Sequence, residues 1–313
     1  MNNSNIDILV SEVGPRDGLQ SINSIMSLAD KKAWITAEYD AGAREIEVGS
    51  FVPAKILPQL ADTAEVVAHA ITLLGLNVAV LVPNLRGAED AVAAGAHKIT
   101  IPLSVSETHS LRNVRRTHAE MLAEIRQIAT RLQALPTTTR PRFEGALSTA
   151  FGCTLEGAIA DSKVIALAEQ LMAAGCDEVG LSDTTGYGNP AQVKRLTQGI
   201  WSAIGRENLT GIHLHNTRGQ GLANVLAAID VGLTTIDASL GGIGGCPFAP
   251  GASGNIVTED LVFMLEAMGL RTGIDLEKLI AVRAQVQRYL PNEALYGFLL
   301  DAGIPKGFVY ADR

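Results

Sequence analysis

Two histidines, His213 and His215, lie two positions apart in an apolar stretch of the sequence. Residues i and i+2 of a β-strand point to the same face, so a strand here would place both imidazoles side by side. An imidazole pair of this kind can bind a divalent metal ion, whereas a single histidine at a strand end more often makes a packing or hydrogen-bonding contact. The spacing therefore predicts a metal site, and such a site also needs oxygen ligands.

Asp17 is the candidate for the carboxylate ligand, and the amide oxygen of Asn255 is a candidate for a further one. Two imidazoles with oxygen donors and open positions favour Mg²⁺ or Mn²⁺ over a structural Zn²⁺. Arg16, next to Asp17, is either an ordinary surface partner of that carboxylate or a fixed cation that neutralises a developing oxyanion. Glu47 is either a partner that orients a metal ligand or a proton acceptor.

A glycine-rich stretch at residues 241–255 carries a further candidate, Cys246. The stretch reads GGIGGCPFAPGASGN and contains six glycines, a density that is unfavourable inside a helix or a strand. It is expected to be a loop that comes close to a ligand or to another backbone. In such a loop Cys246 is either a packed, unreactive thiol or a proton donor to a carbanion that must be shielded from water.

The elements that must position these residues follow an alternating pattern. Short Ile- and Val-rich runs, typical of buried parallel strands, alternate with longer Ala- and Leu-rich segments of helical spacing. The expected strands cover residues 8–13, 44–48, 77–82, 98–101, 141–147, 178–181, 211–214 and 235–239. The expected helices cover residues 27–40, 60–74, 85–93, 113–135, 155–172, 189–204 and 219–231, and several end at glycine.

Eight strands and their helices within about 270 residues predict an α/β protein with a (β/α)₈ TIM barrel, with a doubly wound open sheet as the alternative. Helical patterns at 259–268 and 276–289 predict the eighth barrel helix and a short C-terminal helical extension. We expect a catalytic barrel over residues 1–275 and an extension packed on it over residues 276–313.

In a barrel the reactive face is built at the carboxyl ends of the strands. Polar residues end or follow the expected strands, and we expect them to converge on one pole: Glu12, Arg16, Asp17, Glu45, Glu47, Ser182, Asp183, Thr184, His213, His215, Asn216, Cys246 and Asn255.

Composition limits the partners. The chain has 313 residues, 47% hydrophobic and 19% charged, so a large core is expected. The net charge of −8 disfavours nucleic acid as the main partner. No apolar run is long enough to span a membrane, the N-terminal residues have no secretory or import character, and three dispersed cysteines fit a reducing compartment. A cytoplasmic protein is expected.

Five motifs together resemble the 3-hydroxy-3-methylglutaryl-CoA lyase family, whose members are metal-dependent Claisen-type lyases on this barrel. They are EVGPRDGLQ at 12–20, EIEVGSF at 45–51, LSDTTG at 181–186, HLHNT at 213–217 and the stretch 241–255. The resemblance implies metal ligands at Asp17, His213, His215 and Asn255. It also implies catalytic roles for Arg16, Glu47, Asp183 and Cys246, and substrate contacts from Arg16, Gln20, Ser50 and Thr184.

By the same resemblance, the chain is expected to be a carbon–carbon lyase that uses Mg²⁺ or Mn²⁺. It would cleave the C2–C3 bond of a 3-hydroxy-3-methylglutaryl-CoA-like thioester to acetyl-CoA and a ketone, acetoacetate for the standard substrate. Arg16 would stabilise the enolate oxygen and Cys246 would protonate the carbon. The acyl-CoA substrate, a homodimer or higher oligomer and a place in leucine catabolism belong to the same expectation.

Departures from the family pattern affect the acyl pocket. Gly180 stands where a serine is expected, and Asn216 and Arg218 stand where an acid and a tyrosine are usual. An alternative is therefore a lyase for a different 3-hydroxy-3-substituted acyl-CoA. A Claisen-condensing synthase is a second alternative, although it needs no thiol loop and usually carries a long C-terminal region. A non-catalytic binding protein is expected to have lost a metal ligand or Arg16, and neither is lost.

Overall fold

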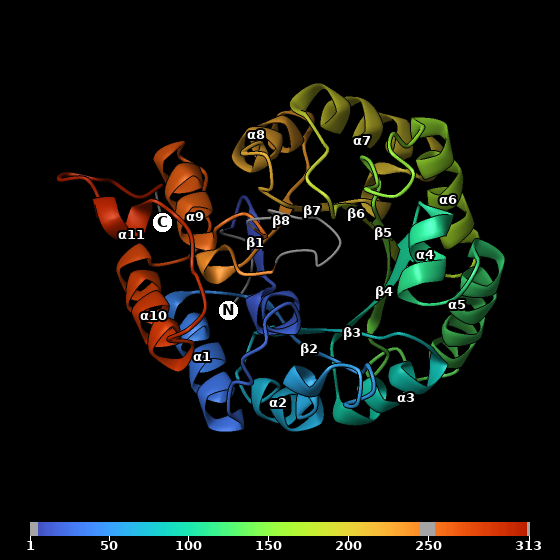
Figure 1. The fold of residues 1–313 in the computed structure, drawn as a ribbon, viewed down its shortest axis with the longest axis horizontal. Helices are drawn as coiled ribbons and strands as arrows, with labels where there is room; N and C mark the ends of the chain where they lie inside the picture. The colour runs from blue at the N-terminus through green and yellow to red at the C-terminus, as the bar shows by residue number, and fades with distance from the viewer. Residues whose placement is uncertain (1–5, 245–253, 312–313) are drawn as a thin grey trace.

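Eight parallel strands close into a barrel around which the helices form an outer ring (Figure 1). The computed structural model of the chain describes residues 6–244 and 254–311. Each strand pairs in parallel with the next along the chain, and β8 closes the sheet against β1. The strands are β1 Leu9–Glu12, β2 Glu45–Ser50, β3 Asn77–Leu81, β4 Lys98–Ser104, β5 Arg142–Ser148, β6 Glu178–Asp183, β7 Gly211–Leu214 and β8 Thr235–Ala238. The predicted barrel is confirmed.

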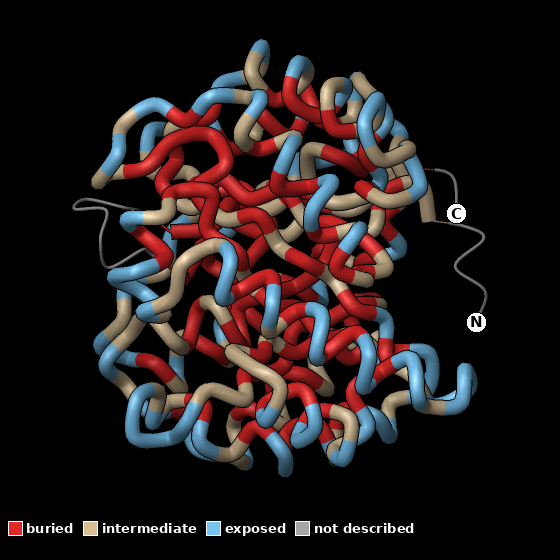
Figure 2. The backbone as a smooth tube through the Cα atoms, turned by 90° about the vertical axis from the view of Figure 1, so that its right-hand side faces the viewer, coloured by how far each residue is buried: buried red, intermediate tan, exposed pale blue. Residues whose placement is uncertain are grey.

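Each strand is followed by a helix that covers the outside of the sheet. These helices are α1 Leu28–Ala41, α2 Thr63–Ala70, α3 Leu85–Ala94, α4 Glu107–Asn113 with α5 His118–Gln133, α6 Asp161–Ala173, α7 Pro190–Ile204, α8 Gly221–Val231 and α9 Thr258–Ala267. Buried residues make up the interior of the molecule, the barrel strands included, and exposed residues lie at its periphery (Figure 2). The apolar outer faces of the strands and the inner faces of the helices thus share one core.

Local signals in the sequence set the helix ends. The side chain of Ser27 accepts the backbone N–H of Asp30 at the start of α1. Gly42, Gly95 and Gly232 end α1, α3 and α8 in the left-handed conformation, with φ of 115°, 86° and 107°. Glycine adopts this conformation without the strain that a Cβ would cause, so the predicted glycine stops are confirmed.

Two expected helices differ from those observed. The helix expected at 113–135 is α5, which begins only at His118 because the side chain of Thr117 caps it, and α4, which the side chain of Ser106 caps, was not predicted. The helix expected at 155–172 begins only at Asp161, since the backbones of Cys153 and Gly157 first bond to each other in a tight turn.

The C-terminal segment adds α10 Leu276–Tyr289 and α11 Leu299–Ala302 outside the ring, and α10 lies against α1 (Figure 1). A buried ion pair joins Arg283 of α10 to Glu259 of α9, with Nη1 3.0 Å from Oε1. We propose that the barrel ends at residue 275 and that the C-terminal extension begins at residue 276, with this ion pair holding the extension against the barrel. No helix in the described ranges has the length and apolar character needed to cross a membrane.

Candidate metal centre and active site

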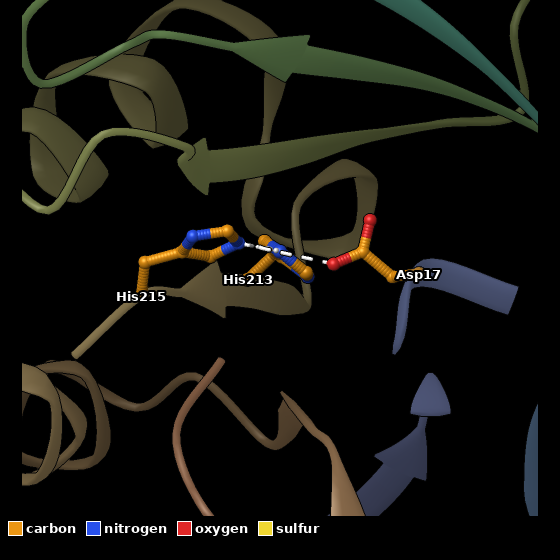
Figure 3. A group of neighbouring side chains, drawn as sticks. All are labelled: Asp17, His213 and His215. Atoms are coloured by element: carbon orange, nitrogen blue, oxygen red, sulfur yellow. Dashed lines mark hydrogen bonds and ion pairs between the residues drawn. The ribbon is translucent and has the colours of Figure 1, made fainter. Parts of the chain in front are cut away.

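His213, His215 and Asp17 meet at the carboxyl end of the barrel (Figure 3). His213 lies in β7, His215 follows it, and Asp17 lies in the turn Gly14–Gly18 after β1. The Nε2 atoms of the two histidines are 3.0 Å apart, and the Asp17 Oδ2 lies 3.9 Å from Nε2 of His215. One potential ligand atom from each residue falls within 4.8 Å of the others. The predicted HxH pair and the predicted carboxylate therefore share one site.

The spacing and chemistry of these groups fit a divalent cation. Two ligands bound at right angles at about 2.1 Å from Mg²⁺ are about 3.0 Å apart, which matches the separation of the two Nε2 atoms. Asn255 donates from Nδ2 to Asp17 Oδ2 at 2.8 Å and to the Ile243 carbonyl at 3.1 Å. Its Oδ1 is buried and has no hydrogen-bond partner among the described residues. An amide oxygen left unpaired beside a carboxylate and two imidazoles completes a mixed nitrogen and oxygen donor set.

Asp237 of β8 orients His213. The two residues are paired in the strand register, and Oδ2 of Asp237 lies 3.2 Å from Nδ1 of His213. An Nδ1–H that donates to Asp237 leaves Nε2 of His213 free as a ligand atom. Burial lowers the pKa of His213, but the Asp237 hydrogen bond and the charges of Asp17 and Asp237 raise it above its usual value overall.

The surroundings of Asp17 and His215 favour the forms of these two residues that bind a metal. Burial raises the pKa of Asp17, but Arg16 and the two histidines outweigh it and bring this pKa to about 2. Burial and the neighbouring His213 lower the pKa of His215 to about 3. At neutral pH Asp17 is thus an anion and His215 a neutral imidazole, which are the states that ligate cations.

Arg16 is held beside the cluster by two carboxylates. Its Nε donates to Glu47 Oε2 at 2.5 Å and its Nη1 to Asp17 Oδ1 at 2.6 Å. Burial lowers the pKa of Arg16, but the charges of Glu47 and Asp17 raise it overall, so the guanidinium stays charged. Gln20 donates to Asp17 Oδ1 at 2.7 Å. Both side chains therefore contact Asp17, while the catalytic role predicted for Arg16 and the substrate contacts predicted for both residues stay predictions.

The described ends of the glycine-rich stretch lie against the same cluster. A Cβ on Gly244 would lie 2.2 Å from Nδ2 of Asn255 and 2.8 Å from Oδ2 of Asp17, so glycine alone fits there. The chain returns at Gly254, where a Cβ would lie 2.3 Å from the Gly242 carbonyl oxygen. The expected close approach is thus present at both ends. Cys246 lies outside the described residues, and its catalytic role stays a prediction.

Other predicted site residues have different neighbours. Asp183 accepts the backbone N–H groups of Tyr187 and Gly188, both at 2.9 Å, so its two oxygens shape the loop after β6. Thr184 accepts the backbone N–H of Thr149 at 3.0 Å. Ser50 lines a cleft of about 710 Å³ near α2 and α3. The roles predicted for these three residues remain predictions.

Two expected acids do not reach the cluster. Glu12 is buried outside the barrel interior, where it accepts the backbone N–H groups of Gly14 and Leu240 and the hydroxyl of Thr258. Glu45 lies near the amino ends of the strands, with Oε1 3.8 Å from Lys98 Nζ. The prediction of convergence is wrong for Glu45, which begins β2 and so lies at the opposite end of the barrel. Glu12 ends β1 at the carboxyl end, but its side chain points outward and does not join the site.

Arg218 belongs to the rim of the site. Its Nη1 donates to the carbonyl oxygens of Thr185 and Gly186, both at 3.0 Å, and its guanidinium stacks over the ring of Tyr187 at 4.5 Å. These contacts fix the loop after β6, which Asp183 also holds. Asp237 was missed at the sequence level; the signal that could have found it is its inward position in the strand that pairs with His213.

Comparisons with known proteins agree with this geometry. The HMGL-like family matches residues 7–286. A hydroxymethylglutaryl-CoA lyase of Bacillus subtilis is 39% identical over 295 residues, covering 93% of this chain and 97% of that protein. The mitochondrial hydroxymethylglutaryl-CoA lyase of Arabidopsis thaliana is 39% identical over 287 residues, which are 91% of this chain but 60% of that protein.

Among solved structures, the HMG-CoA lyase of Acinetobacter baumannii in complex with coenzyme A and 3-methylmalate is 42% identical. It superposes with a TM-score of 0.90, and the match covers 98% of both chains. Family match, sequence identity and barrel geometry thus lead to one conclusion: the chain belongs to the HMGL-like, hydroxymethylglutaryl-CoA lyase family.

Proposed function

We propose that the protein is a metal-dependent hydroxymethylglutaryl-CoA lyase, an oxo-acid lyase that releases acetoacetate and acetyl-CoA. The observation that carries the proposal is the Asp17, His213, His215 and Asn255 donor set beside Arg16, in a chain of this family. Mg²⁺ or Mn²⁺ is the cation proposed for the site. When bound, such an ion lowers the pKa of the substrate hydroxyl and polarises the neighbouring oxygen.

The residues of the chain account for the remaining steps. The hydroxyl proton passes to a base, the C2–C3 bond breaks, and its electron pair passes into a thioester enolate. Arg16 supplies the fixed positive charge for the enolate oxygen, because Glu47 and Asp17 hold its guanidinium in place and, among the described residues, these two bonds take two of its five N–H groups. A proton returned to C2 then completes acetyl-CoA, and the remaining carbons leave as the ketone.

The acids that handle these protons are also proposed. Burial raises the pKa of Glu47 despite the opposing charge of Arg16, as suits a carboxyl group that exchanges protons with a substrate. Asp183 is less available, since both of its oxygens accept backbone N–H groups. Cys246 is the proposed donor to C2, because it follows Gly244 by two residues in the sequence. Gly244 lies against Asp17 and Asn255.

A second candidate substrate is favoured by one relative. The Acinetobacter baumannii lyase holds coenzyme A together with 3-methylmalate, a hydroxy diacid. The corresponding thioester, with CoA on the carboxyl next to the methyl-bearing carbon, would give propionyl-CoA and glyoxylate by the same bond cleavage. Gly180, Asn216 and Arg218, the departures from the family pattern, also favour a substrate other than the standard one.

The proposal also covers the partners, the oligomeric state and the location of the enzyme. An acyl-CoA is its substrate and nucleic acid is not its partner, in line with the net charge of −8. We further propose a homodimer or higher homo-oligomer, a cytoplasmic location and a role in leucine catabolism. These follow from family resemblance and composition.

A substrate panel tests the proposal. Purified protein with Mg²⁺ or Mn²⁺ is given 3-hydroxy-3-methylglutaryl-CoA or the 3-methylmalate thioester, and the released acyl-CoA and carbonyl product are both quantified. We expect acetyl-CoA and acetoacetate in equal amounts from the first thioester. Turnover of only the second would move the assignment to the second candidate. The absence of cleavage of either by metal-loaded protein would refute the lyase proposal.

A further inference from the structure

The interior of the barrel below the metal centre carries a group of charged residues that the proposed mechanism does not use. Lys98 Nζ lies 2.5 Å from Glu144 Oε2, 3.2 Å from Glu178 Oε1 and 3.8 Å from Glu45 Oε1. Three carboxylates thus surround one ammonium group. Arg142 offsets part of this excess through its 2.8 Å contact with Glu178 Oε2.

Glu144 points into the barrel. Its neighbour Gly145 faces the outer helices, because a Cβ there would lie 2.9 Å from Leu171 of α6. Alternate residues of a strand face opposite sides, so Glu144 faces the interior. Its side chain is still 15% exposed, which distinguishes it from Glu45 and Glu178 at 7% and 8%. Glu144 is therefore the most exposed of the three carboxylates around Lys98.

The carboxyl group of Glu144 occupies the space of the side chain that Gly180 lacks. A Cβ on Gly180 would lie 2.3 Å from Glu144 Oε1, a separation that real Cβ contacts do not reach. The register of β5 and β6 places Ala146 beside Gly180 and Glu144 beside Glu178. Position 180 is thus not an empty site in the acyl pocket, since an oxygen from the neighbouring strand fills it.

The acyl end of a bound thioester would face this oxygen. The coenzyme A part of the substrate is too large to enter the barrel and must lie outside its carboxyl end. The acyl group is therefore the part that can extend inward past His213. Asp237, which binds His213, is close enough to Glu144 for its charge to raise the pKa of Glu144. Gly180, which Glu144 covers, lies two residues before Ser182, and Ser182 pairs with His213 in the register of β6 and β7, so the carboxyl group of Glu144 lies in the barrel interior one layer below the metal centre.

We propose that Glu144 is a specificity-determining residue of the acyl subsite, where its Oε1 replaces a side chain at position 180 and contacts the far end of the acyl group. When protonated, Glu144 donates a hydrogen bond to a chain that ends in carboxylate. When ionised, it repels that chain and accepts a hydrogen bond from one that ends in hydroxyl. This inference rests on the proposed lyase function.

The groups around Glu144 bring the ionisation of its carboxyl group near neutral pH. Burial raises the pKa of Glu144, Lys98 lowers it, and Glu178 and Asp237 raise it further, with a result of about 7. Glu45 is the third carboxylate beside Lys98, with Oε1 3.8 Å from Nζ. Because the protonated form is lost as the pH rises through this value, the preference for the carboxylate-ended chain should fall with rising pH.

The test uses two thioesters that differ only at the acyl end. They are 3-hydroxy-3-methylglutaryl-CoA and 3,5-dihydroxy-3-methylpentanoyl-CoA, which would release acetyl-CoA with acetoacetate and with 4-hydroxybutan-2-one, respectively. The readout is the ratio of their kcat/KM values from about pH 6 to about pH 8.5. A ratio removes the titration of the metal ligands and of the proton donor, because both substrates share those groups.

We expect the ratio in the parent enzyme to fall by up to about tenfold per pH unit above the pKa of Glu144. In Glu144→Gln, which keeps the size and a hydrogen-bond donor, the ratio should be independent of pH. Glu178→Gln is the matched control: it removes a charge from the same group, so the slope should persist with its midpoint moved to lower pH.

A pH-independent ratio in the parent enzyme, or an unchanged slope in Glu144→Gln, would overturn the inference while leaving the lyase function intact. Failure of the metal-loaded parent to cleave either thioester would instead count against the proposed function. If Glu144→Gln fails to fold, Glu144→Met gives a neutral side chain of similar length for the same measurement, with the same flat ratio expected.

Discussion

Replacement of Asp237 by alanine should weaken metal binding, because the carboxylate fixes the ring of His213. Loss of a group that orients a metal-ligating histidine usually costs about 10–100-fold in metal affinity. The Nδ1 to Oδ2 distance of 3.2 Å is long for a charge-assisted bond, and the Asp237 side chain is 29% exposed. We therefore expect the lower end, about tenfold, which corresponds to about 1.4 kcal/mol of binding free energy.

Titration calorimetry with Mn²⁺ on chelator-treated protein measures this change. Asp237→Asn keeps an oxygen that can accept from Nδ1 but loses the charge, so a loss of about threefold is expected. The control is Asp230→Asn, which removes the same charge from a surface pair with Lys194. Equal Mn²⁺ affinity in Asp237→Ala and the parent would refute the orienting role.

The pH dependence of Mn²⁺ binding supplies a second readout. The proton competes with the metal for His213, so affinity falls as the pH drops through the pKa of that histidine. Asp237 raises this pKa. Its removal should lower the pKa, and binding by Asp237→Ala, although weaker, should persist to lower pH. A merely structural defect would leave the midpoint unchanged.

Four further changes test separate parts of the account. Arg16→Gln should lower kcat in the acetyl-CoA release assay by about 10²–10³, as for loss of an oxyanion contact. Asn255→Ala should weaken Mn²⁺ binding in calorimetry by about tenfold, because a ligand oxygen is lost. Cys246→Ser should lower kcat by about 10²–10⁴ with little change in KM, and substrate should protect the thiol from alkylation. Arg283→Met should cost about 3–5 kcal/mol in urea unfolding, since it leaves Glu259 buried without its cation.

Each of these changes has an outcome that would contradict it. Parent-like kcat in Arg16→Gln would remove the oxyanion role, and the same result in Cys246→Ser would transfer protonation to another acid such as Glu47. Unchanged Mn²⁺ affinity in Asn255→Ala would exclude the amide oxygen as a ligand. Parent-like stability of Arg283→Met would mean that Glu259 can be protonated in the folded state at little cost in unfolding free energy.

Periodicity was sufficient to predict the barrel, because apolar runs and glycine-ended helices are local features of the sequence. The separation of α4 from α5 was harder to predict, since Ser106 and Thr117 act as caps only once the chain turns before each of them. The HxH pair could be predicted from strand geometry alone, and the closed sheet brings Asp17 beside it.

The contacts that the sequence did not reveal are those between strands. Asp237 meets His213 because of the register of β7 and β8, which no short motif encodes. Gly180 appeared to be a missing side chain, whereas Glu144 from β5 fills its space. Motif comparison examines one position at a time. It therefore does not detect a side chain on one strand that fills the space left by a glycine on the neighbouring strand.

Chelation followed by metal replacement tests whether the site at Asp17, His213 and His215 requires a metal ion for activity. Protein treated with EDTA and desalted is assayed for release of acetyl-CoA from 3-hydroxy-3-methylglutaryl-CoA, before and after addition of Mg²⁺ or Mn²⁺. We expect loss of activity on chelation and recovery on addition of either ion, with no recovery in Asp17→Ala or His213→Ala proteins that remain folded by circular dichroism. Full activity of the EDTA-treated parent protein would contradict the metal centre assigned to Asp17, His213, His215 and Asn255.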